Sequence, residues 1–428
     1  MGTRRGLCAG QGKPGHRPRK SSRGVSGAEG SASAGTSFKL GQGQSSVLYA
    51  ILHDWLGVRL FGYISFRAAL AALSGFALAL WWGRPMIAWL KRHRVKENVS
   101  DTGSYELSRV AKEAGKDSTP TMGGSFLVAA LLAAVLLCAR LDNLYVVLAV
   151  LLTAGLAAVG FVDDYKKLTI PNCTGLTASA KMLGLSCVTL GVLVSYVLYA
   201  HTSGRWTALD LYPPFFKNVA IPLARAGAIG IAVFLAFEWL VVVGSANAVN
   251  ITDGMDGLAA GCMIISASAL VVFCYVTGRP DWTAYLNLPH VSHASEMAVV
   301  GAALIGACMG FLWYNAYPAQ VFMGDSGSLP LGGIMAWMAL VSKQELVLPL
   351  IASVFVLDLL TSFLQTFWAK RHSGRRIFTM APIHHGLQHY GGVFVKQAHG
   401  WHEVQVVVRF WILAACGALA SLALLKVR

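Results

Sequence analysis

Charged residues are scarce in this sequence. Only 13% of its 428 residues are charged and 55% are apolar, whereas soluble domains carry about one-quarter charged residues. This composition excludes an ordinary soluble globular protein, because so few charges cannot cover a surface that faces water. It predicts an integral membrane protein.

Cysteine lacks the spacing that a metal or redox site requires. The eight cysteines form no Cys-x-x-Cys pair, and most of them lie inside apolar stretches. In such surroundings a free cysteine behaves as a small hydrophobic residue. The sequence therefore predicts neither a disulfide nor a zinc site.

Long apolar stretches are plentiful. A helix needs about 20 apolar residues to cross a bilayer, and ten stretches are candidates. They predict an all-α integral membrane protein with about ten transmembrane helices. The stretches are 68–90, 125–140, 144–162, 178–200, 219–243, 258–277, 297–316, 329–342, 346–368 and 404–426.

The orientation follows from Lys and Arg in the loops, because positive residues favour the cytoplasmic side. The loops after the first, third and ninth stretches are rich in them, at 91–116, 166–167 and 370–396. The remaining loops are poorer. With ten spans, this pattern places both termini in the periplasm.

Residues 1–46 differ from the rest of the chain. They are rich in Gly, Ser, Lys and Arg, and Glu29 is their only acid. Because such a composition cannot bury a core, we expect a disordered extension before a polytopic membrane domain at 47–428. A mis-set start or dispensable tail is favoured over an arm that binds lipid headgroups. This segment inflates the net charge of +15, so that charge does not indicate nucleic-acid binding.

Polar stretches gather at the predicted cytoplasmic ends of the spans. Ionisable residues at membrane depth are unfavourable, and by default they indicate function. Because odd-numbered spans end on the cytoplasmic side, all these stretches fall on one face. They are KDSTPTMGG (116–124), FVDDYKK (161–167), NAVNITDGMDG (247–257), WYNAYPAQVFMGDSGS (313–328) and APIHHGLQHYG (381–391).

Acids and lysines in and beside these stretches predict a metal-assisted phosphate site. Clustered carboxylates repel each other unless a cation neutralises them, and oxygen ligands beside phosphates favour Mg²⁺. Lysines suit phosphate as point charges. Any single aspartate could instead cap a helix or form a surface ion pair. The acids are Asp163, Asp164, Asp253, Asp256 and Asp325, and the lysines are Lys116, Lys167 and Lys181.

Six motifs in this order resemble the phospho-N-acetylmuramoyl-pentapeptide transferase family, also called translocase I. They are TPTMGG, FVDDYKK, NAVNITDGMDG, WYNAYPAQVFMGDSGS, APIHH and VVVRFWI. The resemblance covers roughly residues 47–428. This family lies within the polyprenyl-phosphate N-acetylhexosamine-1-phosphate transferase superfamily, whose members share the aspartate motifs.

The resemblance implies an Mg²⁺-dependent reaction at the cytoplasmic face of a bacterial inner membrane, in peptidoglycan biosynthesis. UDP-N-acetylmuramoyl-pentapeptide would give its phospho-sugar to undecaprenyl phosphate, yielding lipid I and UMP. A sister enzyme of O-antigen or teichoic-acid synthesis, using another UDP-N-acetylhexosamine, is the main alternative. A secondary transporter is less favoured, because it would need a polar midplane site and repeated halves. A homodimer is left open.

Residue roles follow from the same resemblance. Asp163 would engage the lipid phosphate, and both a single displacement and a phospho-aspartyl route agree with the residues. Asp325 and Asp253 are the predicted metal ligands, and Phe322 is the expected stacking surface for uracil unless it is a core aromatic. The catalytic set is Asp163, Asp164, Asp325, His384 and His385. The substrate-binding set is Lys116, Thr121, Lys167, Lys181, Asn247, Asn250, Asp253, Asp256, Asn315 and Phe322.

Glycines complete two of the motifs. Gly254 and Gly257 are expected to let the backbone turn tightly against a ligand. Gly386 stands where the family has a third histidine after His384 and His385. His389 could substitute for that histidine if the segment is helical. Direct metal binding by the histidine pair is ranked low, because imidazole is a softer ligand than Mg²⁺ selects.

Overall fold

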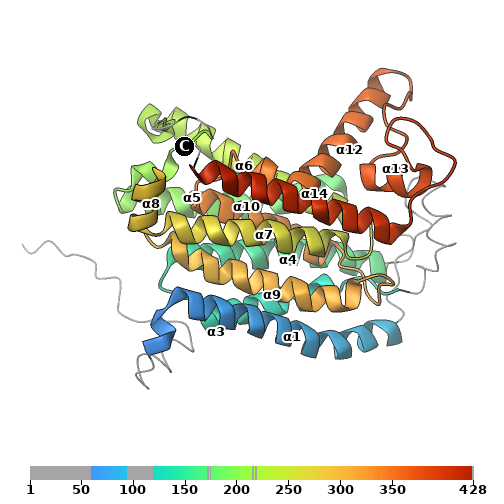
Figure 1. The fold of residues 1–428 in the computed structure, drawn as a ribbon, viewed down its shortest axis with the longest axis horizontal. Helices are drawn as coiled ribbons and strands as arrows, with labels where there is room; N and C mark the ends of the chain where they lie inside the picture. Colours follow the sequence, from blue (N-terminus) through green and yellow to red (C-terminus); the bar gives the residue numbers. More distant parts are fainter. Residues whose placement is uncertain are drawn as a thin grey trace, which may run out of the picture. The chain divides into compact units, whose positions relative to one another are not determined.

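The fold is built from helices. The computed structural model describes residues 59–93, 119–170, 173, 175–214, 216 and 219–426. In these residues the only strand-like pairing is a single bridge between Leu211 and Ile221 (Figure 1). Seven helices there are long and apolar enough to cross a membrane. The chain is thus an all-α integral membrane protein, as its composition predicted.

The helices follow the predicted spans closely. The long ones are α1 (Ile64–Arg92), α3 (Gly124–Cys138), α4 (Leu144–Thr169), α5 (Ala178–Thr202), α6 (Gly227–Thr252), α7 (Leu258–Thr277), α9 (Met297–Asn315), α10 (Asp325–Val341), α12 (Ser353–Arg371) and α14 (Glu403–Ala423). Three short ones are α8 (Pro280–Leu286), α11 (Leu348–Ile351) and α13 (Ile383–Tyr390). Each predicted span contains a helix, while the count of ten spans and the placement of the termini stay predictions.

Two predicted spans differ from the helices found. The fifth, 219–243, was placed too early, because α6 continues to Thr252 through a polar stretch that the apolar pattern had excluded. The ninth, 346–368, is broken at Ala352 between α11 and α12. There α14 comes so close that a Cβ on Gly417 would lie 2.5 Å from the carbonyl oxygen of Leu350.

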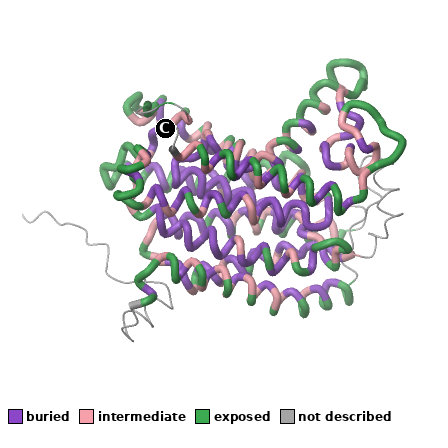
Figure 2. Tube along the Cα trace, viewed as in Figure 1, coloured by how far each residue is buried: buried purple, intermediate pink, exposed green. Residues whose placement is uncertain are grey.

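Helix α10 is enclosed by the others. Each of its residues is buried (Figure 2), and it packs against α3, α4, α6 and α7. A Cβ on Gly332 would lie 2.3 Å from the carbonyl oxygen of Ser245, and one on Gly333 would lie 2.2 Å from Leu156 Cδ1. Small residues of this kind let helices approach closely in a membrane, where packing rather than water exclusion drives association.

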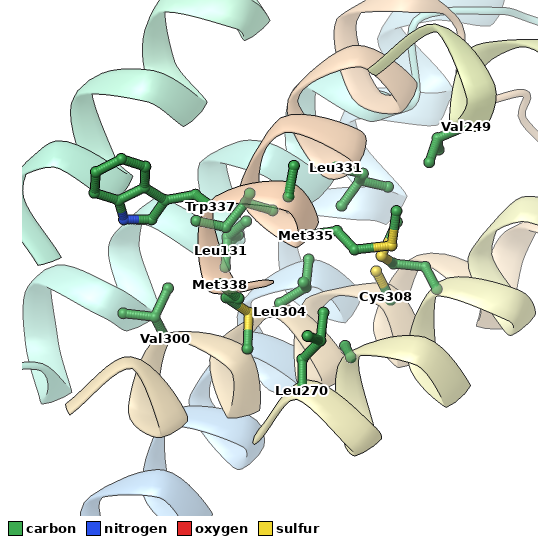
Figure 3. Packing of buried hydrophobic residues seen from close by; sticks show 14 of the residues in the cluster. Leu131, Val249, Leu270, Val300, Leu304, Cys308, Leu331, Met335, Trp337 and Met338 are labelled. Atoms are coloured by element: carbon green, nitrogen blue, oxygen red, sulfur yellow. The ribbon is translucent and has the colours of Figure 1, made fainter. Parts of the chain in front are cut away.

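The apolar core around α10 fixes its direction. Leu304, Met335, Trp337 and Met338 are fully buried and lie among the packed helices in Figure 3. Trp337 Nε1 donates to the carbonyl oxygen of Tyr145 at 3.0 Å, which satisfies the one polar atom of the indole. A helix held in this way presents its first residue, Asp325, at a defined point.

Candidate active site

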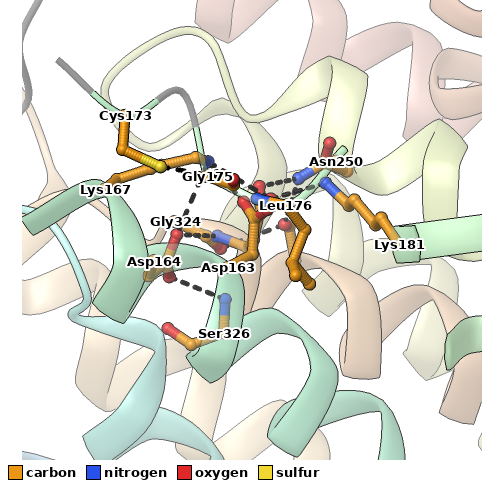
Figure 4. A network of polar contacts seen from close by, with 12 residues as sticks. Asp163, Asp164, Lys167, Cys173, Gly175, Leu176, Lys181, Asn250, Gly324 and Ser326 are labelled. Atoms are coloured by element: carbon orange, nitrogen blue, oxygen red, sulfur yellow. Dashed lines mark hydrogen bonds and ion pairs between the residues drawn. The ribbon is translucent and has the colours of Figure 1, made fainter. Parts of the chain in front are cut away.

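Three carboxylates meet where α4 ends and α10 begins. Asp163 and Asp164 lie in the last turns of α4, and Asp325 is the first residue of α10. All three are buried, and their ligand atoms lie within 4.8 Å of one another. Figure 4 shows Asp163 and Asp164 beside Lys167 and Gly324. Negative charges at this spacing repel each other, so the cluster requires neutralising cations.

Two lysines supply part of that neutralisation. Lys167 Nζ lies 2.7 Å from Asp163 Oδ2 and 3.3 Å from Asp325 Oδ2, while Lys181 Nζ contacts the same Asp325 oxygen. Asp163 and Lys167 are four residues apart on α4, so they share a helix face. The side chains of Lys167 and Lys181 are 34% and 20% exposed. Three acids and two lysines leave one negative charge, and the lysines can reach a charged molecule in solvent.

Asp164 also holds α10 in place. Its Oδ1 accepts from the backbone N–H of Asp325 at 3.2 Å, and its Oδ2 accepts from that of Ser326 at 2.9 Å. Backbone N–H groups at a helix start lack partners within the helix and attract negative charge. The alternative that one aspartate caps a helix thus applies to Asp164, which remains part of the carboxylate cluster.

Two glycines make room for the carboxylates. Gly175 and Gly324 have φ of +96° and +72°, a region that side chains rarely adopt. A Cβ on Gly175 would lie 2.7 Å from Asp163 Oδ1, and one on Gly324 would lie 2.7 Å from Asp164 Oδ2. The backbone N–H of Leu176, next to Gly175, donates to Asp163 Oδ1 at 2.7 Å. Glycine is therefore required at positions 175 and 324, where a side chain would collide with a carboxylate.

The two asparagines of α6 are placed differently. Asn250 Nδ2 donates to Asp325 Oδ1 at 2.6 Å and to Ser328 Oγ at 2.8 Å, so Asn250 joins the cluster. Asn247 Nδ2 donates to the carbonyl oxygen of Val243, one turn back in its own helix. Of the predicted asparagine contacts in this motif, only Asn250 reaches the carboxylates through a hydrogen bond seen here.

Asp253 is outside the carboxylate group. It follows the last residue of α6 and is only partly buried, and the described acids that gather are Asp163, Asp164 and Asp325. The role of Asp253 as a metal ligand beside Asp325 stays a prediction. The helix ends at Thr252, which carries Asp253 one turn beyond Asn250.

The turn between α6 and α7 is tied to the 315–321 segment. The backbone N–H of Gly257 donates to Asn315 Oδ1 at 3.0 Å, and Asn315 Nδ2 donates to the carbonyl oxygen of Val321 at 2.9 Å. The backbone N–H of Ala319 donates to Asp256 Oδ2 at 2.9 Å. Asp256 and Asn315, both predicted to bind substrate, are buried and hold these backbone segments together.

Glu403, which lies outside the sequence motifs, supports the same turn. This buried residue begins α14, and its Oε1 accepts from the backbone N–H of Asp256 at 2.9 Å. Its Oε2 accepts from Gln388 Nε2 of α13 at 3.3 Å. The available signal was an acid directly before the apolar stretch 404–426.

Thr121 and Phe322 lie on neighbouring backbone segments. The N–H of Phe322 donates to the carbonyl oxygen of Pro120 at 2.9 Å, and the N–H of Gly123 donates to that of Phe322 at 2.8 Å. Thr121 is buried, and Phe322 is partly buried. Their contact with a nucleotide stays a prediction, as does that of Lys116, which lies outside the described residues.

The histidines lie on the helix α13, and they are not equivalent. His384 is fully buried, and its Nδ1 lies 2.9 Å from Asp358 Oδ2 of α12. His385 is partly buried, and its ring centroid lies 4.3 Å from that of His384. Asp358 was missed, although an acid within the apolar stretch 346–368 is itself a signal of function.

Gly254, in the turn between α6 and α7, lies next to the rings of both histidines. A Cβ on Gly254 would lie 2.8 Å from His384 Nε2 and 3.0 Å from His385 Nε2. The requirement at this glycine is thus space for two rings. Gly257, in contrast, has φ of +79°, which confirms the expected tight turn there.

Gly386 occupies a crowded position on α13. A Cβ there would lie 3.0 Å from Thr379 Oγ1 and 3.1 Å from the carbonyl oxygen of Met380. The segment is helical, so the condition for His389 to lie near His385 is met, and their ring centroids are 6.0 Å apart. That His389 substitutes for the third histidine of the family stays a prediction.

The carboxylate cluster has the chemistry of a divalent-metal site. Its donors are all carboxylate oxygens, which hard cations such as Mg²⁺ prefer. Asp163, Asp164 and Asp325 offer one oxygen each within 4.8 Å, and their charge exceeds that of the adjacent lysines by one. The residues fit such an ion.

Fold and site together define a class: a multi-pass membrane protein with buried carboxylates and lysines suited to phosphate chemistry. Residues 145–343 match the family model described as glycosyl transferase family 4. This match supports a polyprenyl-phosphate sugar-1-phosphate transferase, a class that uses a nucleotide sugar and a polyprenyl phosphate. The matched region holds the whole carboxylate cluster, whereas the histidines lie beyond it.

Proposed function

We propose that the protein transfers phospho-N-acetylmuramoyl-pentapeptide from its UDP conjugate to undecaprenyl phosphate, in a bacterial inner membrane. An oxygen of the lipid phosphate bonds to the sugar-bearing phosphorus. The bond between that phosphorus and the UMP oxygen breaks, which releases UMP and leaves lipid I. The lipid phosphate needs no base at neutral pH, because its second ionisation lies near pH 6.

The observation that carries this proposal is the cluster of Asp163, Asp164 and Asp325 with its two lysines, inside the region that matches the family model. Phosphoryl transfer depends on positioning and on offsetting charge. Lys167 and Lys181 are partly exposed and already lie in contact with carboxylates. They can exchange those contacts for the phosphates of a donor.

Different residues of the cluster contact the lipid acceptor and the nucleotide donor. Asp163 orients the lipid phosphate, and Lys181 contacts the donor diphosphate. Asn250 holds Asp325 through its amide at 2.6 Å. Asp325, with Asp163 and Asp164, would hold Mg²⁺, which when bound offsets the negative charge that the diphosphate carries.

Substrate choice rests on the histidine segment. APIHH and VVVRFWI carry the resemblance to the pentapeptide transferases, and both lie outside the matched region. A Cβ on Gly254, in the turn that follows Asn250, would lie 2.8 Å from His384 Nε2 and 3.0 Å from His385 Nε2. This proximity supports a role for the histidine segment in contacting the donor's sugar.

The test compares two donors. Purified protein in detergent receives undecaprenyl phosphate, Mg²⁺ and either UDP-N-acetylmuramoyl-pentapeptide or UDP-N-acetylglucosamine, and UMP release is measured. We expect turnover with the first donor, its loss with a chelator and its return with Mg²⁺. Turnover with the second donor alone would overturn the substrate assignment and favour the sister enzyme.

A further inference from the structure

Asp358 is a buried acid whose position calls for an explanation. It lies on α12 within a predicted membrane span, and it is fully buried. A carboxyl group in such a place is unfavourable unless it is paired. Its Oδ2 lies 2.9 Å from His384 Nδ1, and His384 is equally buried. This pair joins α12 to α13.

The far side of the His384 ring faces the turn between α6 and α7. Among the residues described, its Nε2 has no hydrogen-bond partner, and it lies 2.8 Å from the position of a Cβ on Gly254. His385 Nε2 lies 3.0 Å from the same position. Both rings therefore abut one glycine, and a shift of His384 must disturb His385 or the turn.

Exposure separates the two histidines. The His384 side chain is 0% exposed, whereas His385 is partly exposed. A fully enclosed ring cannot touch a substrate without rearrangement of the turn. Of the two histidines predicted to be catalytic, only His385 is placed to meet the donor.

We propose that Asp358 and His384 are positioning residues, which fix His385 against the Gly254 turn, and that His385 contacts the donor's phosphate or sugar. This inference rests on the proposed function. A carboxylate that accepts from imidazole Nδ1–H fixes both the ring orientation and the tautomer, as carboxylates behind metal-bound histidines do.

Double-mutant cycles test whether Asp358 acts through the histidines. Asp358→Asn and His384→Gln should each lower kcat by about 10-fold to 100-fold, as losses of orienting partners do, with little change in the KM for donor. The double variant that carries both substitutions should have a kcat no lower than that of either single variant. In a His385→Gln background, Asp358→Asn should have no further effect. Glu238 is another buried acid, on α6. The Glu238→Gln variant is the matched control, and its kcat should equal that of the wild type.

A second variant covers the case in which Asp358→Asn does not fold. Gly254→Ala crowds the same two rings from the opposite side, and it keeps the Asp358 and His384 side chains themselves unchanged. It should lower kcat by a similar factor, while Gly244→Ala, whose Cβ meets nothing within 4 Å, should not. Losses that multiply in the cycles, or full activity in Gly254→Ala, would overturn the proposal.

A readout without donor separates this inference from the proposed function. In protein labelled with ¹⁵N-histidine, the His385 ring resonances should shift in Asp358→Asn and in His384→Gln but not in Glu238→Gln. If neither UDP donor turned over and these shifts were present, the proposed function would fail and the positioning role would stand. Unmoved resonances would overturn the positioning role whichever donor is used.

Discussion

The two ends of α10 both carry buried charges, yet they are built differently. At its start, Asp325 meets two carboxylates and two lysines whose side chains are 34% and 20% exposed. Just beyond its end, Lys343 and Glu345 are each 1% exposed. Lys343 Nζ donates to the carbonyl oxygen of Ala208 at 2.6 Å and lies 3.5 Å from Glu345 Oε1.

A third charge lies near that second end. Glu238 of α6 is fully buried, and neither of its carboxylate oxygens has a hydrogen-bond partner in the part of the chain that the structure describes. It interacts electrostatically with Lys343 and Glu345. Lys343 Nζ also lies 5.9 Å from the ring of Phe234, one turn before Glu238. The charged side chains at this end are therefore buried, and Lys343 is already paired with protein oxygens.

Burial of charge does not by itself mark an active site in this protein. The start of α10 differs in three respects: three carboxylates converge within 4.8 Å, the lysines are partly exposed to solvent, and glycines leave room for the carboxylates. The end of α10 has none of these among the residues described. We therefore expect changes at the start to affect turnover and changes at the end to affect stability.

The largest effect is expected for Asp325→Asn, which keeps the shape and removes the charge shared by Lys167 and Lys181. Turnover should fall by about 1,000-fold or more, since losing a group that organises transition-state charge costs this much. Glu345→Gln is the control at the other end and should retain turnover with a lower unfolding temperature in detergent. UMP release and thermal unfolding measure both. An Asp325→Asn enzyme within tenfold of wild type would refute the assignment.

The lysines give the next comparison. Lys181→Met should lower turnover by about 100-fold, because it removes a partly exposed charge that contacts Asp325. Lys343→Met should leave turnover nearly unchanged and lower the unfolding temperature, because it removes the buried cation that lies 3.5 Å from Glu345 Oε1. Steady-state kinetics beside detergent unfolding would separate the two. If Lys181→Met and Lys343→Met lowered turnover equally, the two ends of α10 would not differ in their roles.

Glycine substitutions sharpen the comparison further. Gly324→Ala and Gly374→Ala both place a side chain at positive φ, but only at Gly324 would the Cβ meet a carboxylate, Asp164 Oδ2 at 2.7 Å. The backbone strain is thus shared, of about 1 kcal/mol or more. We expect turnover to fall about tenfold or more for Gly324→Ala alone, since displacing a catalytic group by a fraction of an ångström is costly. Similar kinetics for both variants would show that strain, not crowding of the cluster, sets the loss.

Much of the fold and the central cluster could be predicted from the sequence. Apolar stretches long enough to span a bilayer located the helices, and polar stretches at their ends located Asp163, Asp164 and Asp325. These signals are local, because each depends on a few adjacent residues. The end of α6 was harder, because Asn247 and Asn250 reduce hydropathy while their segment stays helical.

The rest depends on contacts between distant segments. Nothing near Asn315 in the sequence shows that its amide bonds Gly257 and Val321. The need for glycine at 254 comes from histidines 130 and 131 residues further along the chain, at His384 and His385. Partners of this kind are set by packing, and a single sequence gives their types without their pairing.

The smallest effect on turnover is expected for Glu238→Met. Burying a carboxyl group without a hydrogen bond is unfavourable, and Glu238→Met removes that group while Lys343 keeps Glu345 as a counter-charge. We therefore expect an unchanged kcat and an equal or higher unfolding temperature in detergent. Reduced stability would show that Glu238 offsets Lys343 in the folded protein. A large loss of turnover with stability intact would mean that the enclosed end of α10 takes part in the reaction, and the contrast between the two ends would fail.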